Sequence, residues 1–160
     1  MKLQTIATIV LILAVIGLVD SVYATYEHYE YLKDSASKAF CDISSEISCS
    51  AVNGSEYSEI FGIPVAATGA AWFVVTIVLA LEMRKKTRTG FWKNAPFYLF
   101  VWSVIGLFSI MYFIYVELFL IGSICILCTI VHIIVVITLL LSYKALEKPI
   151  GKYISEIFYK

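Results

Sequence analysis

Four long apolar runs constrain this chain more than any other feature. They cover residues 3–26, 60–81, 95–116 and 120–143, and Asp20 is their one acidic or basic residue apart from His132. A bilayer core of ~30 Å is crossed by ~20 helical residues, and each run reaches that length. None shows the alternation of a barrel strand, and a helix satisfies its own backbone in lipid. We therefore expect an all-α integral membrane protein. It is a bundle of four transmembrane helices in one domain over residues 1–160, with a loop at residues 27–59 on its outer face.

Composition supports a membrane location. Hydrophobic residues make up 61% of the chain and charged residues 15%, whereas soluble domains have ~45–50% and ~25%. The 12 basic and 12 acidic residues balance, which argues against a basic surface for nucleic acid. The first run could also be a signal peptide, but no small-x-small cleavage site precedes a polar start, so a retained helix is expected.

Basic residues predict the orientation, because loops rich in Lys and Arg stay in the cytoplasm. Ten of the 12 fall at the two ends of the chain and between the second and third runs: Lys2, Arg84, Lys85, Lys86, Arg88, Lys93, Lys144, Lys148, Lys152 and Lys160. The 27–59 segment holds only Lys33 and Lys38 beside seven acidic residues. Both termini are expected in the cytoplasm and the 27–59 segment outside. The membrane would be the cell membrane, or that of the endoplasmic reticulum in a eukaryote.

All four cysteines fall on the predicted outer, oxidising side, where disulfides persist. Cys125 and Cys128 form a Cys-x-x-Cys pair, so they share one helix face and can close an exchangeable disulfide. We expect Ser123 to cap this helix, which puts Cys125 in its first turn, where the helix end favours a thiolate. Cys128 would lie one turn, ~4.5 Å, deeper, within reach of a lipid-soluble electron acceptor.

Cys41 and Cys49 lie in the outer loop, separated by a polar spacer that we expect to be flexible. Such a pair could accept electrons from a protein thiol and pass them to the helix pair by disulfide exchange. Two alternatives remain open. The cysteines could form structural disulfides in a non-enzymatic four-helix protein, or they could bind zinc, although a zinc site needs four converging ligands.

The order of these motifs resembles the vitamin K epoxide reductase family. The resemblance rests on Cys41 and Cys49 with the residues between them, on Ser55, on the Phe-Gly-Ile-Pro of residues 61–64 and on the later Cys-x-x-Cys. It implies a four-helix bundle around a quinone of the ubiquinone, menaquinone or vitamin K type, and no metal. It also implies that Cys125 and Cys128 form the active-site disulfide, with Cys128 beside the quinone. Cys41 and Cys49 would then carry electrons from a thioredoxin-like partner on the outer face.

The resemblance implies a function in which protein thiols reduce a quinone and exported proteins gain disulfides. Microbial members often carry a fused thioredoxin-like domain; this sequence has none, so a separate partner is expected. Ser55 matches a hydroxyl residue beside the quinone, although serine also favours turns. His132 stands where vertebrate members have a tyrosine, a departure that favours quinone reduction over vitamin K epoxide reduction. Epoxide reduction in the endoplasmic reticulum is the alternative activity. We expect His132 to contact either the quinone or a neighbouring helix, Asp20 to lie at a helix end, and Glu117 to be solvated.

Overall fold

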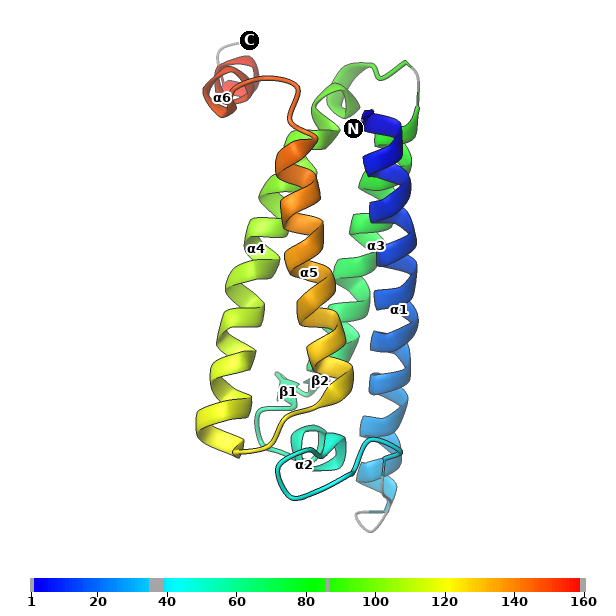
Figure 1. The fold of residues 1–160 in the computed structure, drawn as a ribbon, viewed down its shortest axis with the longest axis vertical. Helices are drawn as coiled ribbons and strands as arrows, with labels where there is room; N and C mark the ends of the chain where they lie inside the picture. Colours follow the sequence, from blue (N-terminus) through cyan, green and yellow to red (C-terminus); the bar gives the residue numbers. More distant parts are fainter. Residues whose placement is uncertain (1, 35–38, 86, 159–160) are drawn as a thin grey trace.

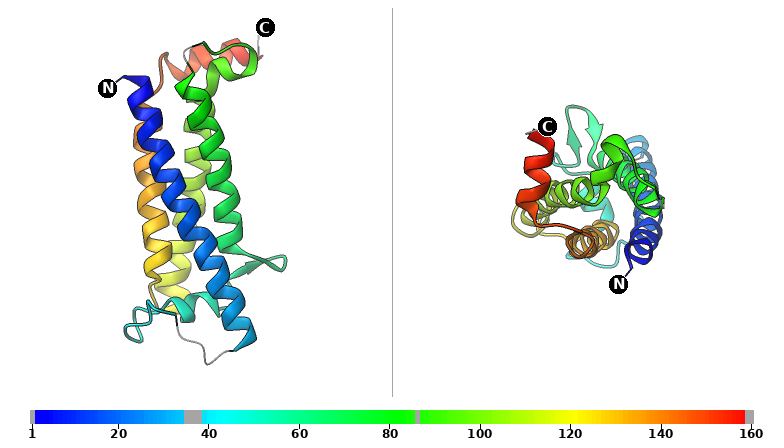
Figure 2. Two further views of the ribbon diagram at one scale, coloured as in Figure 1. Left: turned by 90° about the vertical axis from the view of Figure 1, so that its right-hand side faces the viewer. Right: turned by 90° about the horizontal axis from the view of Figure 1, so that it is seen from above.

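The computed structural model describes residues 2–34, 39–85 and 87–158, and four long helices run side by side in it (Figure 1). They are α1 (Leu3–Lys33), α3 (Val65–Arg84), α4 (Ala95–Tyr115) and α5 (Ile126–Lys144). α1 lies against α3 and α5, and α4 lies against the same two helices, so the four form a bundle when seen from above (Figure 2). Each is long and apolar enough to cross a bilayer. The expected all-α membrane bundle is confirmed.

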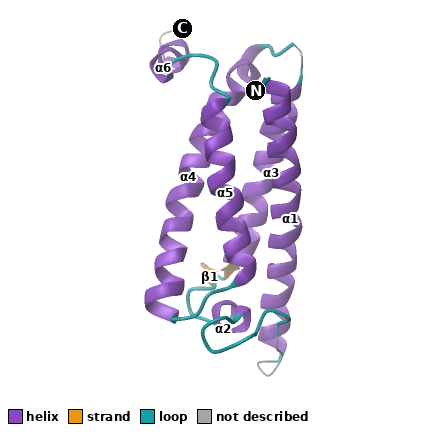
Figure 3. Cartoon of the chain, in the orientation of Figure 1, coloured by secondary structure: helices purple, strands orange, loops and turns teal. Residues whose placement is uncertain are grey.

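Short elements cluster at the ends of the bundle (Figure 3). They are α2 (Cys49–Asn53), the antiparallel hairpin β1 (Glu59–Ile60) and β2 (Ile63–Pro64), the 3-10 turn η1 (Gly90–Asn94), the π-helical turn η2 (Val116–Ile121) and α6 (Ile150–Phe158). Both chain ends and the α3–α4 connection lie at one end of the bundle, whereas α2 and the hairpin lie at the other (Figure 1). Three basic residues of the orientation argument, Lys38, Lys86 and Lys160, fall outside the described residues.

The first and second membrane helices differ from the predicted runs at their outer ends. α1 continues past Tyr26 to Lys33, because Ala24 and His28, one turn apart, both remain on its buried face. α3 starts at Val65 rather than at residue 60, because residues 59–64 form the hairpin. Phe61 and Gly62 turn that hairpin with φ of 53° and 76°, a left-handed geometry that suits glycine.

The third and fourth membrane helices divide later than predicted. η2 continues α4 through Ile121, and Gly122 ends it with φ of 71°. α5 then begins at Ile126, not at residue 120, and Cys125 is its N-cap. Ser123, the expected cap, makes no capping bond, and its buried hydroxyl has no partner among the described residues. The first cysteine of the pair therefore precedes the helix instead of lying in its first turn.

Small side chains let α1 and α3 pack closely. The buried face of α1 includes Ala7, Ala14, Gly17, Ser21 and Ala24. A Cβ atom at Gly17 would lie 2.2 Å from the ring of Phe73 on α3, so a larger residue would force that buried ring to move. Small residues at the contact are typical of membrane helices, since lipid offers no hydrophobic drive between them.

Candidate active site

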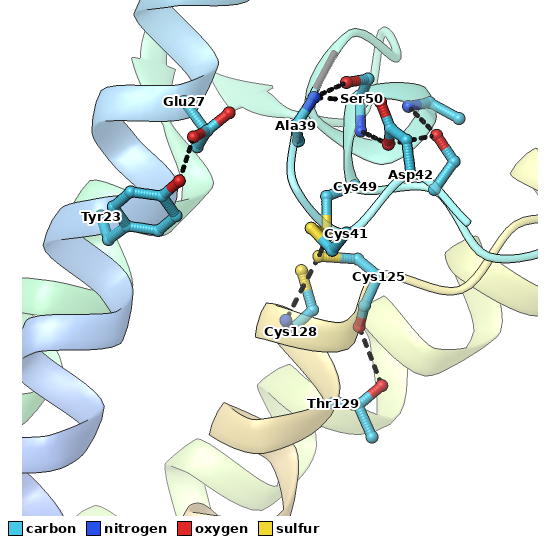
Figure 4. The surroundings of a disulfide bond; sticks show 12 residues. Tyr23, Glu27, Ala39, Cys41, Asp42, Cys49, Ser50, Cys125, Cys128 and Thr129 are labelled. Atoms are coloured by element: carbon cyan, nitrogen blue, oxygen red, sulfur yellow. Dashed lines mark hydrogen bonds between the residues drawn. A yellow bond between two sulfur atoms is a disulfide. The ribbon is translucent and has the colours of Figure 1, made fainter.

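Sulfur atoms of all four cysteines gather at the end of the bundle that carries α2 (Figure 4). Cys41 and Cys49 are joined by a disulfide, with Cα atoms 5.7 Å apart. Cys125 and Cys128 are free thiols, and Cys125 Sγ lies 3.6 Å from Cys49 Sγ. The sulfur atoms of Cys49 and Cys125, which are 76 positions apart in the chain, are thus in contact. From this distance, disulfide exchange between them needs little movement.

The carboxylate of Asp42 organises the loop that carries the disulfide. It accepts hydrogen bonds from Ser48 Oγ (2.8 Å), Ser50 N (2.9 Å) and Ala39 N (3.0 Å). Burial disfavours the charged carboxylate, but these hydrogen bonds outweigh burial and lower the pKa of Asp42. Asp42 is therefore an ionised cross-brace next to Cys41 at neutral pH.

Backbone hydrogen bonds also fasten this loop to the segment before α5. Ile47 and Ile124 form a parallel bridge, in which Ser48 N donates to Ile124 O (3.1 Å) and Ile124 N donates to Glu46 O (2.9 Å). The spacer was expected to be flexible, but its residues 46–48 are hydrogen-bonded to the segment that leads into Cys125. This pairing holds the loop disulfide over the start of α5.

The Cys125 side chain caps the N-terminus of α5. Its Sγ accepts a hydrogen bond from Cys128 N at 3.3 Å, as an N-cap side chain does. The positive end of the helix dipole points at the same atom. Thr129 Oγ1 donates to Cys125 O at 2.9 Å and steadies this first turn (Figure 4).

A cavity of about 430 Å³ opens between the helices beside Cys128. Of the four cysteines, all of which the structure describes, Cys128 is the one that lines it, while Cys125 is fully buried against the loop disulfide. Most of the wall is apolar, yet three buried polar atoms in it have no partner among the described residues: Asp20 Oδ2, Asn53 Nδ2 and Trp72 Nε1. Two of these are N–H donors, which suits a flat apolar molecule with acceptor oxygens.

Glu117 is buried beside the cysteine pair, so the expectation of a solvated residue was wrong. Its side chain is 5% exposed, because η2 carries the chain inward past the end of α4. The carboxyl lies close to the thiol of Cys128 and to the backbone N–H of Cys125, and it lines the cavity. No basic side chain in the described ranges forms an ion pair with it.

The role of His28 was also not predicted from the sequence, because the outer loop was expected to start at residue 27. It is 2% exposed and lines the cavity from α1. Its Nδ1 donates to Asn53 O (2.9 Å), and its Nε2 lies 3.0 Å from Glu59 Oε1. His28 thereby ties α1 to the end of α2 and to the hairpin. The four-residue spacing between Ala24 and His28 could have indicated that both lie on one buried helix face.

Ser55, His132 and Asp20 all line the cavity. Ser55 Oγ donates its proton to Val52 O at 2.8 Å within the turn, and its oxygen can still accept a hydrogen bond. His132 lies one turn below Cys128 on α5. Asp20 is well inside α1 rather than at its end, because the helix continues to Lys33. In the described ranges, no three His, Cys, Asp or Glu side chains gather as metal ligands.

Comparison with known families decides what this arrangement is. A sequence model described as the Vitamin K epoxide reductase family matches residues 8–143. The chain belongs to the vitamin K epoxide reductase family. Membership makes it a membrane oxidoreductase of disulfides and quinones. The matched span contains all four cysteines, Glu117, His132 and every other residue that lines the cavity.

Proposed function

We propose that this vitamin K epoxide reductase family member is a thiol:quinone oxidoreductase. It would take two electrons from a thioredoxin-like protein, pass them through Cys41/Cys49 and Cys125/Cys128, and deliver them to a quinone, so that exported proteins acquire disulfides. The observation that carries the proposal is the division of the helix pair: Cys125 contacts the loop disulfide at 3.6 Å, while Cys128 faces the cavity.

The proposed route conserves electrons at each exchange. The partner's two thiols reduce the Cys41–Cys49 disulfide and become a disulfide. Cys49 then attacks Cys125 of an oxidised Cys125–Cys128 pair, and Cys41 resolves the mixed disulfide. The loop pair ends oxidised and the helix pair reduced, which is the combination of bonds seen here. A quinone, bound as the oxidising substrate, takes the two electrons with two protons.

Several cavity residues support quinone as the acceptor. The unpartnered N–H groups of Asn53 and Trp72 could donate to its oxygens. His132 and Ser55 line the same space, and we propose that His132 also contacts the bound ring. The apolar walls of α3 and α4 suit a lipid-soluble substrate. The protein supplies position and hydrogen bonds, whereas the redox chemistry belongs to the quinone and the thiols.

We further propose that the cysteine end of the bundle faces the outside of the cell membrane. The chain ends and the α3–α4 connection, with most of the basic residues, share the opposite end. Thioredoxin-like oxidants act outside the cytoplasm, where disulfides persist.

The test uses purified protein in lipid with a soluble quinone. Cys125→Ala and Cys128→Ala should each abolish quinone reduction, because the helix pair has no substitute. Cys41→Ala should keep turnover with a small permeant dithiol and lose turnover with a reduced thioredoxin-like protein. Equal loss of activity with both donors would rule out the relay. Vitamin K epoxide in the same assay tests the alternative activity.

A further inference from the structure

Glu117 is a buried carboxyl that lines the cavity together with the Cys128 thiol and lies close to that thiol. It reaches Cys128 from a different element, since η2 follows α4 while Cys128 belongs to α5. The side chain is 5% exposed and has no cationic partner in the described part of the chain. Ionisable groups inside a membrane protein are costly and are usually functional. A buried carboxyl that serves only packing would be expected to find a basic partner.

From this geometry we propose that Glu117 is a catalytic residue, which takes the proton of Cys128 and gives it to the quinone. This inference rests on the proposed quinone reductase activity and adds a residue to it. Glu117 fits because its carboxyl touches both places between which a proton must move. It lies close to the Cys128 thiol, and both side chains line the cavity proposed for the quinone.

The step balances as follows. The thiols of Cys125 and Cys128 lose two electrons and two protons and become one disulfide, while the quinone gains both and becomes a quinol. The Glu117 carboxylate accepts the proton of Cys128 as that sulfur forms a bond to a quinone ring carbon, and the resulting acid delivers the proton to a quinone oxygen. Cys125 then loses its proton to water and attacks Cys128 Sγ. The sulfur–carbon bond breaks with its electron pair left on the ring, and the second quinone oxygen takes a proton from water.

A purely structural role for Glu117 is the competing explanation, because its carboxyl also lies close to Cys125 N at the start of α5. Glu117→Gln separates the two roles. The amide oxygen can still accept from Cys125 N, but an amide cannot take up the proton of a thiol. Glu117→Asp keeps a base one methylene further from the sulfur. Glu46→Gln is the matched control, since it makes the same change at an exposed position of the outer loop.

The experiment follows the first turnover of ubiquinone-1 by each protein after full chemical reduction and removal of the reductant. The helix pair is then already reduced, so the first quinone is reduced without the partner and before any exchange with the loop pair. We expect Glu117→Gln to lower the rate at saturating quinone about 100-fold, the usual size of a lost general base, with little change in the half-saturating quinone concentration. Glu117→Asp should fall between Gln and wild type, and Glu46→Gln should match wild type.

The pH dependence provides a second readout. The rate for Glu117→Gln should rise steeply with pH, since hydroxide must now take the proton, whereas the wild-type rate should vary less. Other titratable groups that face the cavity from the packed elements remain in the variant, so the difference between the profiles reports on residue 117; they are Asp20, His28, Tyr57, Cys128 and His132.

The outcomes are distinct. Wild-type protein that reduces no quinone would refute the proposed function. Wild-type activity in a correctly folded Glu117→Gln would refute the role of Glu117 alone. If Glu117→Gln does not fold, Glu117→Asp decides, and a rate within twofold of wild type would refute the role.

Discussion

Cys125 and Cys128 are three residues apart and have opposite surroundings. Cys125 is fully buried between the loop disulfide and the end of α5, while Cys128 lines the cavity next to Glu117. One sulfur can therefore exchange with another disulfide while its neighbour meets an apolar substrate. At the scale of single residues, function depends on the groups that hold these surroundings in place.

Trp72 is such a group, and Gly106 determines its position. The Trp72 ring stacks on Trp102 with centroids 6.1 Å apart, and a Cβ atom at residue 106 would lie 2.9 Å from Trp72 Cζ2. We expect Gly106→Ala to push the indole N–H away from its place in the cavity and to raise the half-saturating quinone concentration roughly three- to tenfold, the effect of losing one hydrogen bond. Quinone titrations measure this.

Gly151→Ala is the matched control for that variant, because a Cβ at Gly151 meets nothing within 4 Å. It should bind quinone as the wild type does. Identical titrations for both variants would show that the place of Trp72 is irrelevant to the substrate.

The brace at Asp42 leads to a prediction about pH. The folded-state pKa of this carboxyl is lowered, so its stabilisation of the loop is complete above the ordinary value of 3.8 and is lost as the pH falls through the lower folded value. At neutral pH, Asp42→Asn should speed reduction of the Cys41–Cys49 disulfide by a phosphine about tenfold. This is the effect of losing a hydrogen bond to a charged group, made smaller because Asp42 is partly exposed.

In strong acid that difference should shrink, because protonated Asp42 resembles asparagine. Glu46→Asn serves as the control at an exposed site in the same loop. A ratio between Asp42→Asn and wild type that stays constant with pH would exclude the ionised brace.

At the scale of elements, the sequence predicted where helices cross the membrane but not how their outer ends are built. Absence of charge marks what lipid tolerates, so α4 was predicted within one residue, as residues 95–116 against Ala95–Tyr115. Outside the lipid, the absence of charged residues does not indicate where a helix ends. The end of α1 continues because Ala24 and His28 are buried. The π-helical turn η2 packs against α2, which is distant from it in sequence.

The site was predictable to a similar extent. The cysteines, Ser55 and His132 could be found from motif and resemblance, because their spacing is local. Glu117, His28 and Asn53 could not, since each acquires its place by a contact between elements: η2 with α5, and α1 with α2. From its charge alone, Glu117 was expected to be exposed to water. It is buried because η2 carries the chain inward.

The contact between the loop and α5 predicts a trapped intermediate. Cys41→Ala combined with Cys128→Ala leaves Cys49 and Cys125, whose sulfurs lie 3.6 Å apart, with no third thiol to resolve their bond. We expect a stable Cys49–Cys125 disulfide under mild oxidation. Proteolysis and non-reducing mass spectrometry would detect the joined peptides.

Cys41→Ala with Cys125→Ala is the matched pair. It leaves Cys49 and Cys128, of which the second faces the cavity, so it should form much less of the link. Two free thiols in the first double variant under the same oxidation would mean that the pairs do not exchange electrons.

At the scale of the whole molecule, the two ends of the bundle are chemically different. One carries the cysteines, the other the chain ends and α6, whose Tyr153 is buried against Phe97 with ring centroids 5.1 Å apart. The proposed orientation predicts that, in a cysteine-free background in intact cells, an impermeant maleimide labels Lys33→Cys but not Lys152→Cys. Lysed cells should label both positions. Labelling of position 152 in intact cells would invert the orientation.

The bridge between Ile47 and Ile124 has a kinetic consequence. A donor tied beside its acceptor reacts as though it were present at a very high effective concentration, on the order of 10⁵ M or more for well-aligned groups. Millimolar thiols in the surroundings would then compete poorly for Cys125. The bridge would therefore favour exchange between the two cysteine pairs over reaction with other thiols, so that few electrons are lost between the partner protein and the membrane.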